Sequence, residues 1–368
     1  LVIDRTHRGR PGIVPVVLMA CGLSIAACAG PSPETVEPLA GSTDPIDAST
    51  TTSTNGITMS SGATATPPSS EDPGADGCPP QQPGRGQMVV TAESNVYSVQ
   101  TYVPAAYGPE PLPAVINWHG LGSNGFQHAV FTDYENLAEQ EGFIVVHPTG
   151  LATGLTGGAR GWELDQFDVA GRDDVAMAEV LIDRLVADFC ADPRRIYSTG
   201  MSNGGFFTAR LVCELADRIA AAVSVAGISH HDGCRPTRAV PYLVVHGTAD
   251  AVVPFSGGDS TLASGVAPAE LEELFDQVIP EELAEFAADF GCEPEPRVAE
   301  RSDEVIAYDY QGCANGIPVT FVEVVDGGHT WPGSPLGPIL EGFVGKTTDD
   351  ISATSDGWAF MSEHSLDD

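Results

Sequence analysis

The stretch IYSTGMSNGG, residues 196–205, places a serine between two glycines in the pattern G-x-S-x-G. A strand pattern precedes Ser202 at 194–200, and a helical pattern follows it at 206–218. A strand, a sharp turn and a helix form the setting in which a serine is presented as a nucleophile. Glycines fit beside it, because side chains there would clash with the neighbouring strand and helix. We therefore predict that Ser202 is a nucleophile rather than one more serine in a glycine-rich turn.

Strand and helix patterns alternate on both sides of this turn. We expect strands at 100–107, 112–120, 143–150, 194–200, 219–227, 241–247 and 318–327, and helices at 131–142, 174–190, 206–218, 269–278, 281–291 and 355–366. The run FIVVHPTG at 143–150 is almost entirely apolar, as is typical of a strand buried in a parallel sheet. The alternation predicts an α/β fold in one domain, residues 78–368, with a mostly parallel central sheet and helices on both faces.

A serine hydroxyl is a weak nucleophile unless a base takes its proton. The strand expected at 241–247 runs into a loop that contains Asp250, and the strand at 318–327 runs into a loop that contains His329. Catalytic groups of open α/β sheets gather at these carboxyl ends, and the chain order Ser, Asp, His is a known one for such triads. We predict that His329 is the general base and that Asp250 orients it.

An acyl-transfer site also needs hydrogen-bond donors for the oxyanion. The loop HGLGSNG at 119–125 follows a predicted strand, and the start of a helix follows Ser202. We predict the backbone N–H groups of Leu121 and Asn203 as the two donors. Trp162 and Trp331 fall in loops at the same end of the sheet, and we expect them to contact the substrate. Plain packing is the alternative for both tryptophans.

Four blocks carry a resemblance to a known group: INWHGLGSN, RRIYSTGMSNGG, VVHGTADAVVPF and GGHTWPG. They resemble the corresponding blocks of the polyhydroxybutyrate depolymerase and feruloyl esterase group of α/β-hydrolases, which is similar to carbohydrate esterase family 1. The resemblance extends from about Cys78 to the end of the chain. The pair Leu121-Gly122 departs from the GC or GG that often follows the first HG in this group.

The resemblance implies the α/β-hydrolase fold and a secreted serine carboxylesterase that uses no cofactor. The expected substrates are polyhydroxyalkanoate oligomers, feruloyl esters or acetyl esters, cleaved through an acyl-enzyme by Ser202, His329 and Asp250. The resemblance also implies a disulfide between Cys292 and Cys313. Two other functions stay open: an acyltransferase on the same fold, and an inactive lipid-tethered binding protein.

The N-terminal residues 1–28 are typical of an export signal. Three arginines precede a short apolar run at 13–28, which is too short for an ordinary membrane span. The run ends in IAAC, which resembles a bacterial lipobox, so we predict that Cys28 is lipidated. An ordinary cleaved signal and an uncleaved anchor are the alternatives.

Residues 29–77 consist mainly of Ser, Thr, Pro, Gly and Ala, without aromatic residues, so we expect a disordered tether. The predicted location is extracellular or in the cell envelope, with a lipid anchor on the outer face of a bacterial membrane. Six cysteines follow Cys28 in the chain, and they suggest three disulfides. From the residues alone the pairing of Cys78, Cys190, Cys213 and Cys234 stays open.

The chain carries 16 basic and 51 acidic residues, so its net charge is 16 − 51 = −35. Such a surface repels nucleic acid and anionic lipid, so we expect neither as a partner beyond the lipid anchor itself. The cysteines show no C-x-x-C spacing, and we therefore predict no metal site. The expected partner is a small or oligomeric ester.

Overall fold

The computed structural model describes residues 78–153, 158–164, 171–231, 233–261 and 275–367. Its strands are β1 (Gly84–Ala92), β2 (Asn95–Val103), β3 (Leu112–Trp118), β4 (Ile144–Thr149), β5 (Leu151–Ala152), β6 (Arg160–Gly161), β7 (Ala191–Met201), β8 (Ala221–Val225), β9 (Tyr242–Gly247), β10 (Arg297–Glu300), β11 (Val305–Tyr310) and β12 (Val319–Val324). Its helices are α1 (Gly125–Thr132), α2 (Tyr134–Glu141), α3 (Asp174–Phe189), α4 (Asn203–Glu214), α6 (Ile279–Asp289), α7 (Gly337–Val344) and α8 (Ser355–Ser362).

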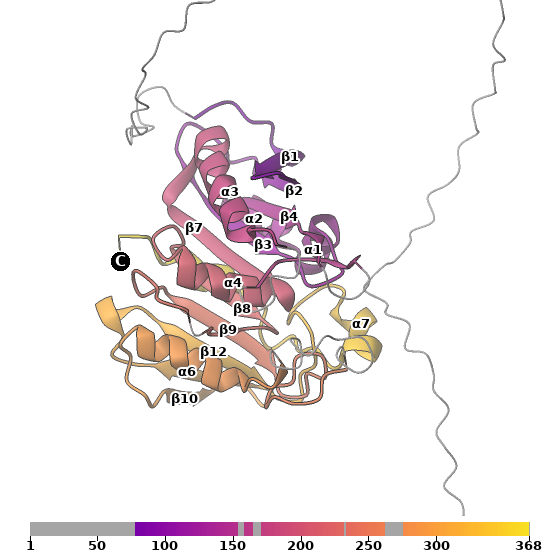
Figure 1. The fold of residues 1–368 in the computed structure, drawn as a ribbon, viewed down its shortest axis with the longest axis vertical. Coiled ribbons are helices and arrows are strands. Elements are labelled where there is room, and N and C mark those ends of the chain that lie inside the picture. Colours follow the sequence, from indigo (N-terminus) through magenta and orange to yellow (C-terminus); the bar gives the residue numbers. More distant parts are fainter. Residues whose placement is uncertain (1–77, 154–157, 165–170, 232, 262–274, 368) are drawn as a thin grey trace, which may run out of the picture. The chain divides into compact units, whose positions relative to one another are not determined.

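The main sheet has the strand order β1-β2-β4-β3-β7-β8-β9-β12-β11-β10 (Figure 1). The central strands, from β4 through β3, β7, β8 and β9 to β12, pair in parallel. The strands at both edges pair antiparallel. This arrangement confirms the predicted mostly parallel sheet, and it brings the carboxyl ends of β7, β9 and β12 to one edge.

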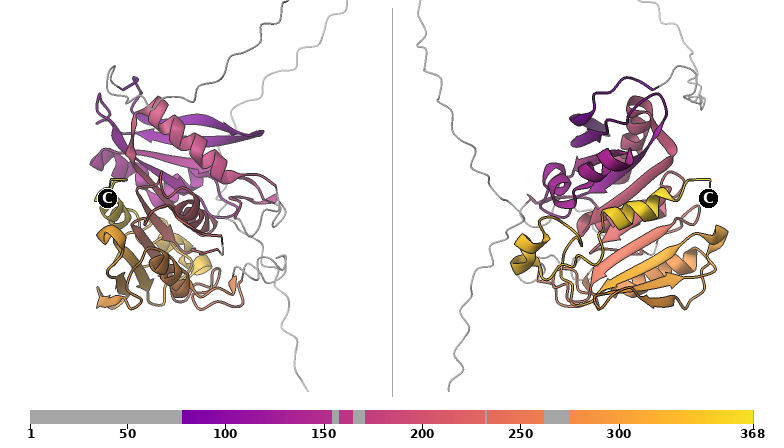
Figure 2. Two further views of the ribbon diagram at one scale, coloured as in Figure 1. Left: turned by 60° about the vertical axis from the view of Figure 1, so that its left-hand side comes forward. Right: turned by 180° about the vertical axis from the view of Figure 1, so that it is seen from behind.

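Helices cover both faces of the sheet, as the alternation predicts. Helices α3, α4 and α6 lie on the face seen in Figure 1, and α8 lies on the opposite face, seen from behind in Figure 2. The two faces bury separate apolar clusters. Along β9, Tyr242 and Val244 belong to the cluster under α3, α4 and α6, whereas Leu243 and Val245 belong to the cluster under α2 and α8. The apolar run therefore serves two cores, as expected of a doubly covered strand.

Several elements differ from the sequence-based expectation. The helix expected at 131–142 is interrupted at Asp133, whose φ of 58° ends α1 and precedes α2. Strands β1, β10 and β11 were not expected. Each lies at or near a sheet edge, where partial exposure weakens the apolar pattern. Most of the helix expected at 269–278 lies outside the described residues.

Three disulfides pair the six cysteines: Cys78–Cys190, Cys213–Cys234 and Cys292–Cys313. The last is the bridge that the resemblance implies, and the other two resolve the open pairing. Cys78–Cys190 spans 112 residues and ties the start of the described chain to the end of α3. Closing so long a loop restricts the unfolded chain, and such bridges typically contribute about 2–4 kcal/mol to stability.

The N-terminal predictions fall outside the described residues. They concern the signal at 1–28, the lipidated Cys28 and the tether at 29–77, and all three stay predictions. Across the described ranges, no helix combines the length and the apolar character that crossing a membrane requires.

Candidate active site

Ser202 occupies a strained turn between β7 and α4. Its φ of 57° and ψ of −122° lie in a region that non-glycine residues rarely adopt. The Ser202 N–H donates to Val225 O at 2.9 Å, and its carbonyl accepts from Phe206 N–H at 2.9 Å. These two bonds hold the backbone on both sides of the strain, which costs about 1–3 kcal/mol.

The flanking glycines are required by close backbone approaches. A Cβ on Gly200 would lie 2.4 Å from Gly204 O, and a Cβ on Gly204 would lie 2.1 Å from Trp118 O. Neither oxygen belongs to a flexible side chain, so neither could move aside cheaply. The G-x-S-x-G pattern thus has the structural cause that the sequence analysis assigned to it.

Asp250 and His329 form a hydrogen-bonded pair beyond the ends of β9 and β12. His329 Nδ1 lies 2.8 Å from Asp250 Oδ2. The other carboxylate oxygen, Oδ1, accepts the N–H groups of Val252 and Val253, each at 2.8 Å. A neutral imidazole that donates Nδ1–H to the carboxylate keeps its lone pair at Nε2, where it can accept a hydroxyl proton.

The Asp250 carboxylate also contacts a second buried imidazole, that of His246. His246 Nε2 lies 3.4 Å from Asp250 Oδ2 and 2.9 Å from Val253 O. Burial acts to raise the pKa of Asp250, but the charge and hydrogen bond of His329, with His246 and the Val253 N–H, hold that pKa below its ordinary value. Asp250 is therefore kept as a carboxylate. In the sequence, this contact is indicated only by the short spacing between His246, near the end of the strand, and Asp250, in the loop that follows it.

Backbone hydrogen bonds connect the strand ends that carry the three residues. Ser202 N–H bonds the last residue of β8, Ala226 N–H bonds Val245 O of β9, and Thr248 N–H bonds Val324 O of β12. Ser202, Asp250 and His329 thus follow strands β7, β9 and β12 at one edge of the sheet. The sequence analysis placed all three at this edge.

The two predicted oxyanion donors lie next to Ser202, one on the loop before α1 and one at the start of α4. A Cβ on Gly120 would lie 3.3 Å from Ser202 Cβ, so the loop before α1 passes close to the serine. The next N–H groups of this loop, on Gly122 and Ser123, donate within the chain, and none of the described hydrogen bonds uses that of Leu121. Asn203 is the first residue of α4, so its N–H has no acceptor within the helix.

The prediction that Trp162 contacts the substrate is wrong, because its side chain is 1% exposed. Its Nε1–H donates to His119 O at 2.9 Å, and its ring packs on Trp118 and Phe207 with centroids 4.9 and 5.4 Å away. Burying this large ring and satisfying its N–H fixes it in the core.

The same prediction is wrong for Trp331, whose side chain is 0% exposed. Its Nε1–H donates to Thr354 Oγ1 at 2.9 Å, and its ring lies against His128 and Tyr134. Thr354 and its segment are distant in sequence, so position beside His329 did not reveal this packing. The alternative reading, plain packing, is correct for both tryptophans.

We predict that Trp331→Phe lowers stability without changing substrate binding. The variant removes the donor to Thr354 Oγ1 and part of a buried ring, which should lower the free energy of unfolding by about 1–3 kcal/mol. KM should stay within about twofold of wild type, because the side chain has no access to the site. Urea unfolding and initial rates measure both quantities. A several-fold rise in KM at unchanged stability would contradict the buried position.

His119 and His147 are buried behind the site and do not act as bases there. His119 Nε2 accepts Gly150 N–H at 2.9 Å, which assigns its proton to Nδ1, 2.7 Å from Gly120 O. Burial lowers the pKa of His119 to about 4 and that of His147 to about 3. Both therefore stay neutral at pH 7 and have structural roles.

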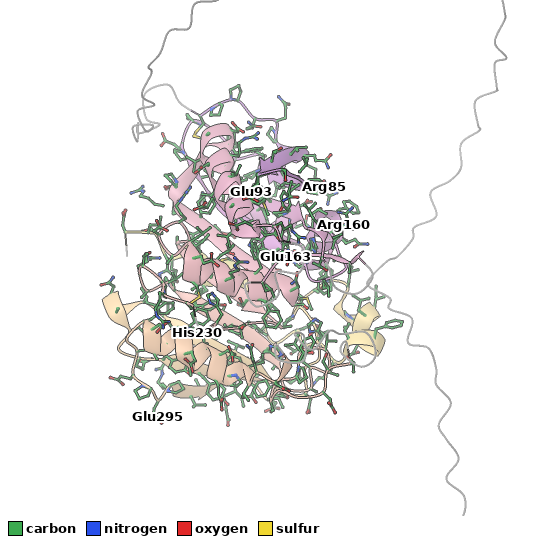
Figure 3. All side chains as sticks on the ribbon, viewed as in Figure 1. Arg85, Glu93, Arg160, Glu163, His230 and Glu295 are labelled. Atoms are coloured by element: carbon green, nitrogen blue, oxygen red, sulfur yellow. A yellow bond between two sulfur atoms is a disulfide. The ribbon has the colours of Figure 1, made fainter. Side chains whose placement is uncertain are left out.

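One group of possible metal ligands occurs among the described residues: His230, Cys234 and Asp289. His230 is labelled in Figure 3. Cys234 is bonded to Cys213, so its sulfur is not a thiolate ligand. His230 Nε2 lies 2.9 Å from Asp289 Oδ2, and the two satisfy each other. This group therefore has the chemistry of a hydrogen-bonded histidine–aspartate pair beside a disulfide rather than of a metal site.

Comparisons with known proteins relate this chain to esterases. Residues 97–233 match the family model described as Esterase PHB depolymerase. The chain is 27% identical over 283 residues to a putative esterase, NocK, of Nocardia uniformis subsp. tsuyamanensis. This match covers 75% of this chain and 81% of the relative. It is 30% identical over 227 residues to feruloyl esterase B of Piromyces equi, covering 60% of this chain and 40% of that enzyme.

The chain therefore spans less than half the length of the Piromyces enzyme. Among solved structures, an acetyl xylan esterase from Aspergillus awamori superposes with a TM-score of 0.46 at 17% identity, covering 67% of this chain and 94% of that one. Together, the sheet order and the strained serine at the strand end show an α/β-hydrolase fold, and the sequence matches show that the chain is similar to the polyhydroxybutyrate depolymerase and feruloyl esterase-like group.

Proposed function

We propose that this chain is a serine hydrolase that cleaves carboxylic esters. The observation that carries the proposal is the strained Ser202 at the sheet edge that also holds the hydrogen-bonded Asp250–His329 pair. Strain of this kind persists only where the surrounding structure maintains it, and it clusters at active sites. The matches to an esterase family support the same reaction class.

In the proposed first half-reaction, His329 Nε2 takes the hydroxyl proton of Ser202 while Oγ attacks the ester carbonyl carbon. The carbonyl oxygen becomes an oxyanion, which accepts the N–H groups of Leu121 and Asn203. Asp250 stabilises the imidazolium that forms and holds its tautomer. The C–O bond then breaks, and the alcohol leaves with the proton from His329 Nε2.

The second half-reaction repeats these steps with water. His329 takes a proton from the water, whose oxygen attacks the acyl carbon bound to Ser202 Oγ. The tetrahedral oxyanion again accepts the same two N–H groups. When the acyl C–O bond breaks, Ser202 regains its proton from His329 and the carboxylic acid is released.

Exposed apolar side chains lie on two helices that adjoin the loops of the site, and they support an ester with an apolar acyl or alcohol group. Ile339 and Phe343 on α7 are 65% and 76% exposed, and Phe126 and Val130 on α1 are 58% and 41% exposed. Helix α7 ends against the catalytic loop, since His329 N–H donates to the last residue of α7 at 2.7 Å. Helices α1 and α7 lie side by side in Figures 1 and 2.

The three disulfides support an exported protein, because such bonds persist in oxidising compartments. We further propose that Cys28 carries the lipid that the lipobox-like sequence indicates. Mass spectrometry of the detergent-extracted protein tests this, since a cleaved and unmodified N-terminus would exclude the anchor.

The function is tested with the full chain against p-nitrophenyl acetate and butyrate, methyl ferulate and a 3-hydroxybutyrate trimer. We expect hydrolysis of at least one ester and covalent labelling of Ser202 by a fluorophosphonate. Folded protein that is neither labelled nor active on any of them would exclude the proposal. If an added acceptor alcohol gives new ester faster than free acid appears, the protein is an acyltransferase instead.

A further inference from the structure

A short segment, residues 160–162, connects the loop that carries Leu121 with the start of α4, which carries Asn203; we call it the bridging segment. On one side it is held by the side chain of Asn203, whose Oδ1 accepts Trp162 N–H at 2.7 Å and whose Nδ2 donates to Trp162 O at 3.1 Å. The amide of Asn203 therefore pairs with both backbone groups of one residue. This side chain is 9% exposed at most, and it points away from solvent into the protein.

On its other side, the bridging segment is bonded to the loop that contains Leu121. Gly122 N–H donates to Arg160 O at 2.7 Å, and Trp162 Nε1–H donates to His119 O at 2.9 Å. The residues on both sides of Leu121 are thus fixed to the segment. A continuous path of hydrogen bonds runs from the Asn203 amide through residues 160–162 to the loop around Leu121.

Packing around Gly161 confirms how closely these parts approach. A Cβ there would lie 2.6 Å from Asn203 Oδ1 and 3.0 Å from Leu121 Cδ1. Gly161 therefore touches a side chain of each donor residue at once. Any larger residue would push the segment away from Asn203, from Leu121 or from both.

A buried arginine holds the bridging segment from behind. Arg172 Nη2 donates to Gly161 O at 2.9 Å and Nη1 donates to Ala152 O at 2.9 Å. The guanidinium also pairs with Asp174 and with Glu163. Figure 3 labels Arg160 and Glu163, the first residue of the segment and the residue that follows it. The segment is therefore fixed on the side of α3, so Asn203 is bonded to a firm support.

We propose that the side chain of Asn203 is a positioning residue that sets the separation of the two oxyanion donors. The inference rests on the proposed esterase function. One donor comes from a loop and the other from the start of α4, and each must lie about 2.7–3.1 Å from the developing oxyanion. The backbone N–H of Asn203 meets the oxyanion, while its side chain fixes the segment that holds the second donor, Leu121 N–H.

The expected effect on kcat comes from misalignment of the Leu121 N–H, because the variant removes no oxyanion donor. Asn203→Ala keeps the backbone N–H but removes both bonds to Trp162, so the loop around Leu121 is held less firmly. Losing a whole oxyanion donor lowers kcat about 10²–10³-fold, and a misplacement near 1 Å costs up to about 10²-fold. We expect kcat to fall about 10- to 100-fold, with KM within about threefold of wild type.

A graded series distinguishes positioning from general loss of structure. In Asn203→Asp, an oxygen can still accept Trp162 N–H, but no group donates to Trp162 O and a negative charge lies beside the oxyanion. We expect a larger fall in kcat for Asp than for Ala. The affinity for a trifluoromethyl ketone, which forms the tetrahedral oxyanion on Ser202, should fall in parallel with kcat.

Asn117→Ala is a matched control. Asn117 is also buried, its Nδ2 donates to Thr132 Oγ1 at 2.8 Å, and its Oδ1 lies 2.9 Å from His128 Nε2. Its Nδ2 also lies 3.3 Å from His147 Nδ1, so the variant removes three buried polar contacts of an asparagine outside the bridging contacts. It should lose stability comparably, while kcat per active site stays within about threefold of wild type.

All rates are divided by the fraction of sites that a fluorophosphonate titrates, so a partly folded sample does not mimic a catalytic loss. Asn203→Ser replaces the alanine variant if the latter does not fold. The inference is overturned if the Asn203 variant keeps kcat within threefold of wild type, or if Asn117→Ala lowers kcat equally. Wild-type protein that is neither labelled nor active would instead refute the esterase function.

Discussion

Ser202→Ala is expected to lower kcat for the best ester by about 10⁴- to 10⁶-fold. Without Oγ no acyl-enzyme forms, so His329 has no serine proton to accept and the two-step route is closed. The donors on Leu121 and Asn203 remain, and in related triads such residual groups still accelerate hydrolysis about 10³–10⁴-fold over water. The measurement is the initial rate on that ester, compared with the wild type at equal concentrations of folded protein.

Ser202→Gly controls for the backbone strain of the turn. Glycine adopts the observed φ of 57° at little cost, so this variant should lose as much activity as the alanine variant while being at least as stable as wild type. An alanine variant that retains more than about 1% of the activity would point to another nucleophile. Ser229, in the run Ser229-His230-His231, would then be the first serine to replace.

The sequence located the sheet edge that carries the proposed catalytic residues, because each parallel strand marks that edge in two ways. Each strand is marked by a short apolar run, and its carboxyl end is marked by the loop that follows. The expected strand at 241–247 is β9, and the expected strand at 318–327 contains β12, so Asp250 and His329 were placed at the right edge. Their direct hydrogen bond then follows from the pairing of β9 with β12.

The edges of the sheet were predicted poorly for a physical reason. In β1, only Met88, Val90 and Ala92 are buried, and the residues between them face solvent. Its sequence GRGQMVVTA therefore lacks the continuous apolar run that marks the central strands. An antiparallel edge strand with one open face leaves a weak signal in composition, and the pairing partner that orders it is a tertiary feature.

Contacts made by side chains in the loops were beyond the reach of the sequence. Trp162 and Trp331 follow strand ends as substrate-binding aromatics often do, but the direction in which each ring turns depends on distant partners. Asn203 and Trp162 are 41 residues apart, and Trp331 and Thr354 are 23 apart. No periodicity links such pairs, so the bonds that hold the oxyanion loops emerge only from the folded chain.

We expect acid to unfold this protein at a higher pH than its carboxylates alone would require, because burial lowers the pKa of four histidines. Burial lowers the pKa of His119 to about 4 and that of His147 to about 3. Burial also lowers the pKa of His128 and of His246. In the unfolded chain, histidine binds a proton near pH 6.5, so between that pH and the lower folded values the unfolded state holds more protons.

This difference in bound protons sets the direction in which stability changes with pH. The stability that neutral, buried histidines contribute is complete above about pH 6.5 and is lost as the pH falls toward their folded pKa values. At pH 4.5, the lowered pKa values of His119 and His147 together should reduce the free energy of unfolding by about 5 kcal/mol. The total stability of a domain is typically about 5–15 kcal/mol. His128 and His246 act in the same direction.

Urea unfolding at several pH values between 8 and 4.5 measures the effect. His147→Asn removes one titrating group, and the slope of unfolding free energy against pH between 6.5 and 4.5 should decrease by about 1 kcal/mol per pH unit. The slope is the quantity to compare, because the substitution also changes the contact of His147 Nδ1 with Asn117 Nδ2, 3.3 Å away. Equal slopes in both proteins would mean that His147 binds its proton equally in the folded and unfolded chains, against the effect of its burial.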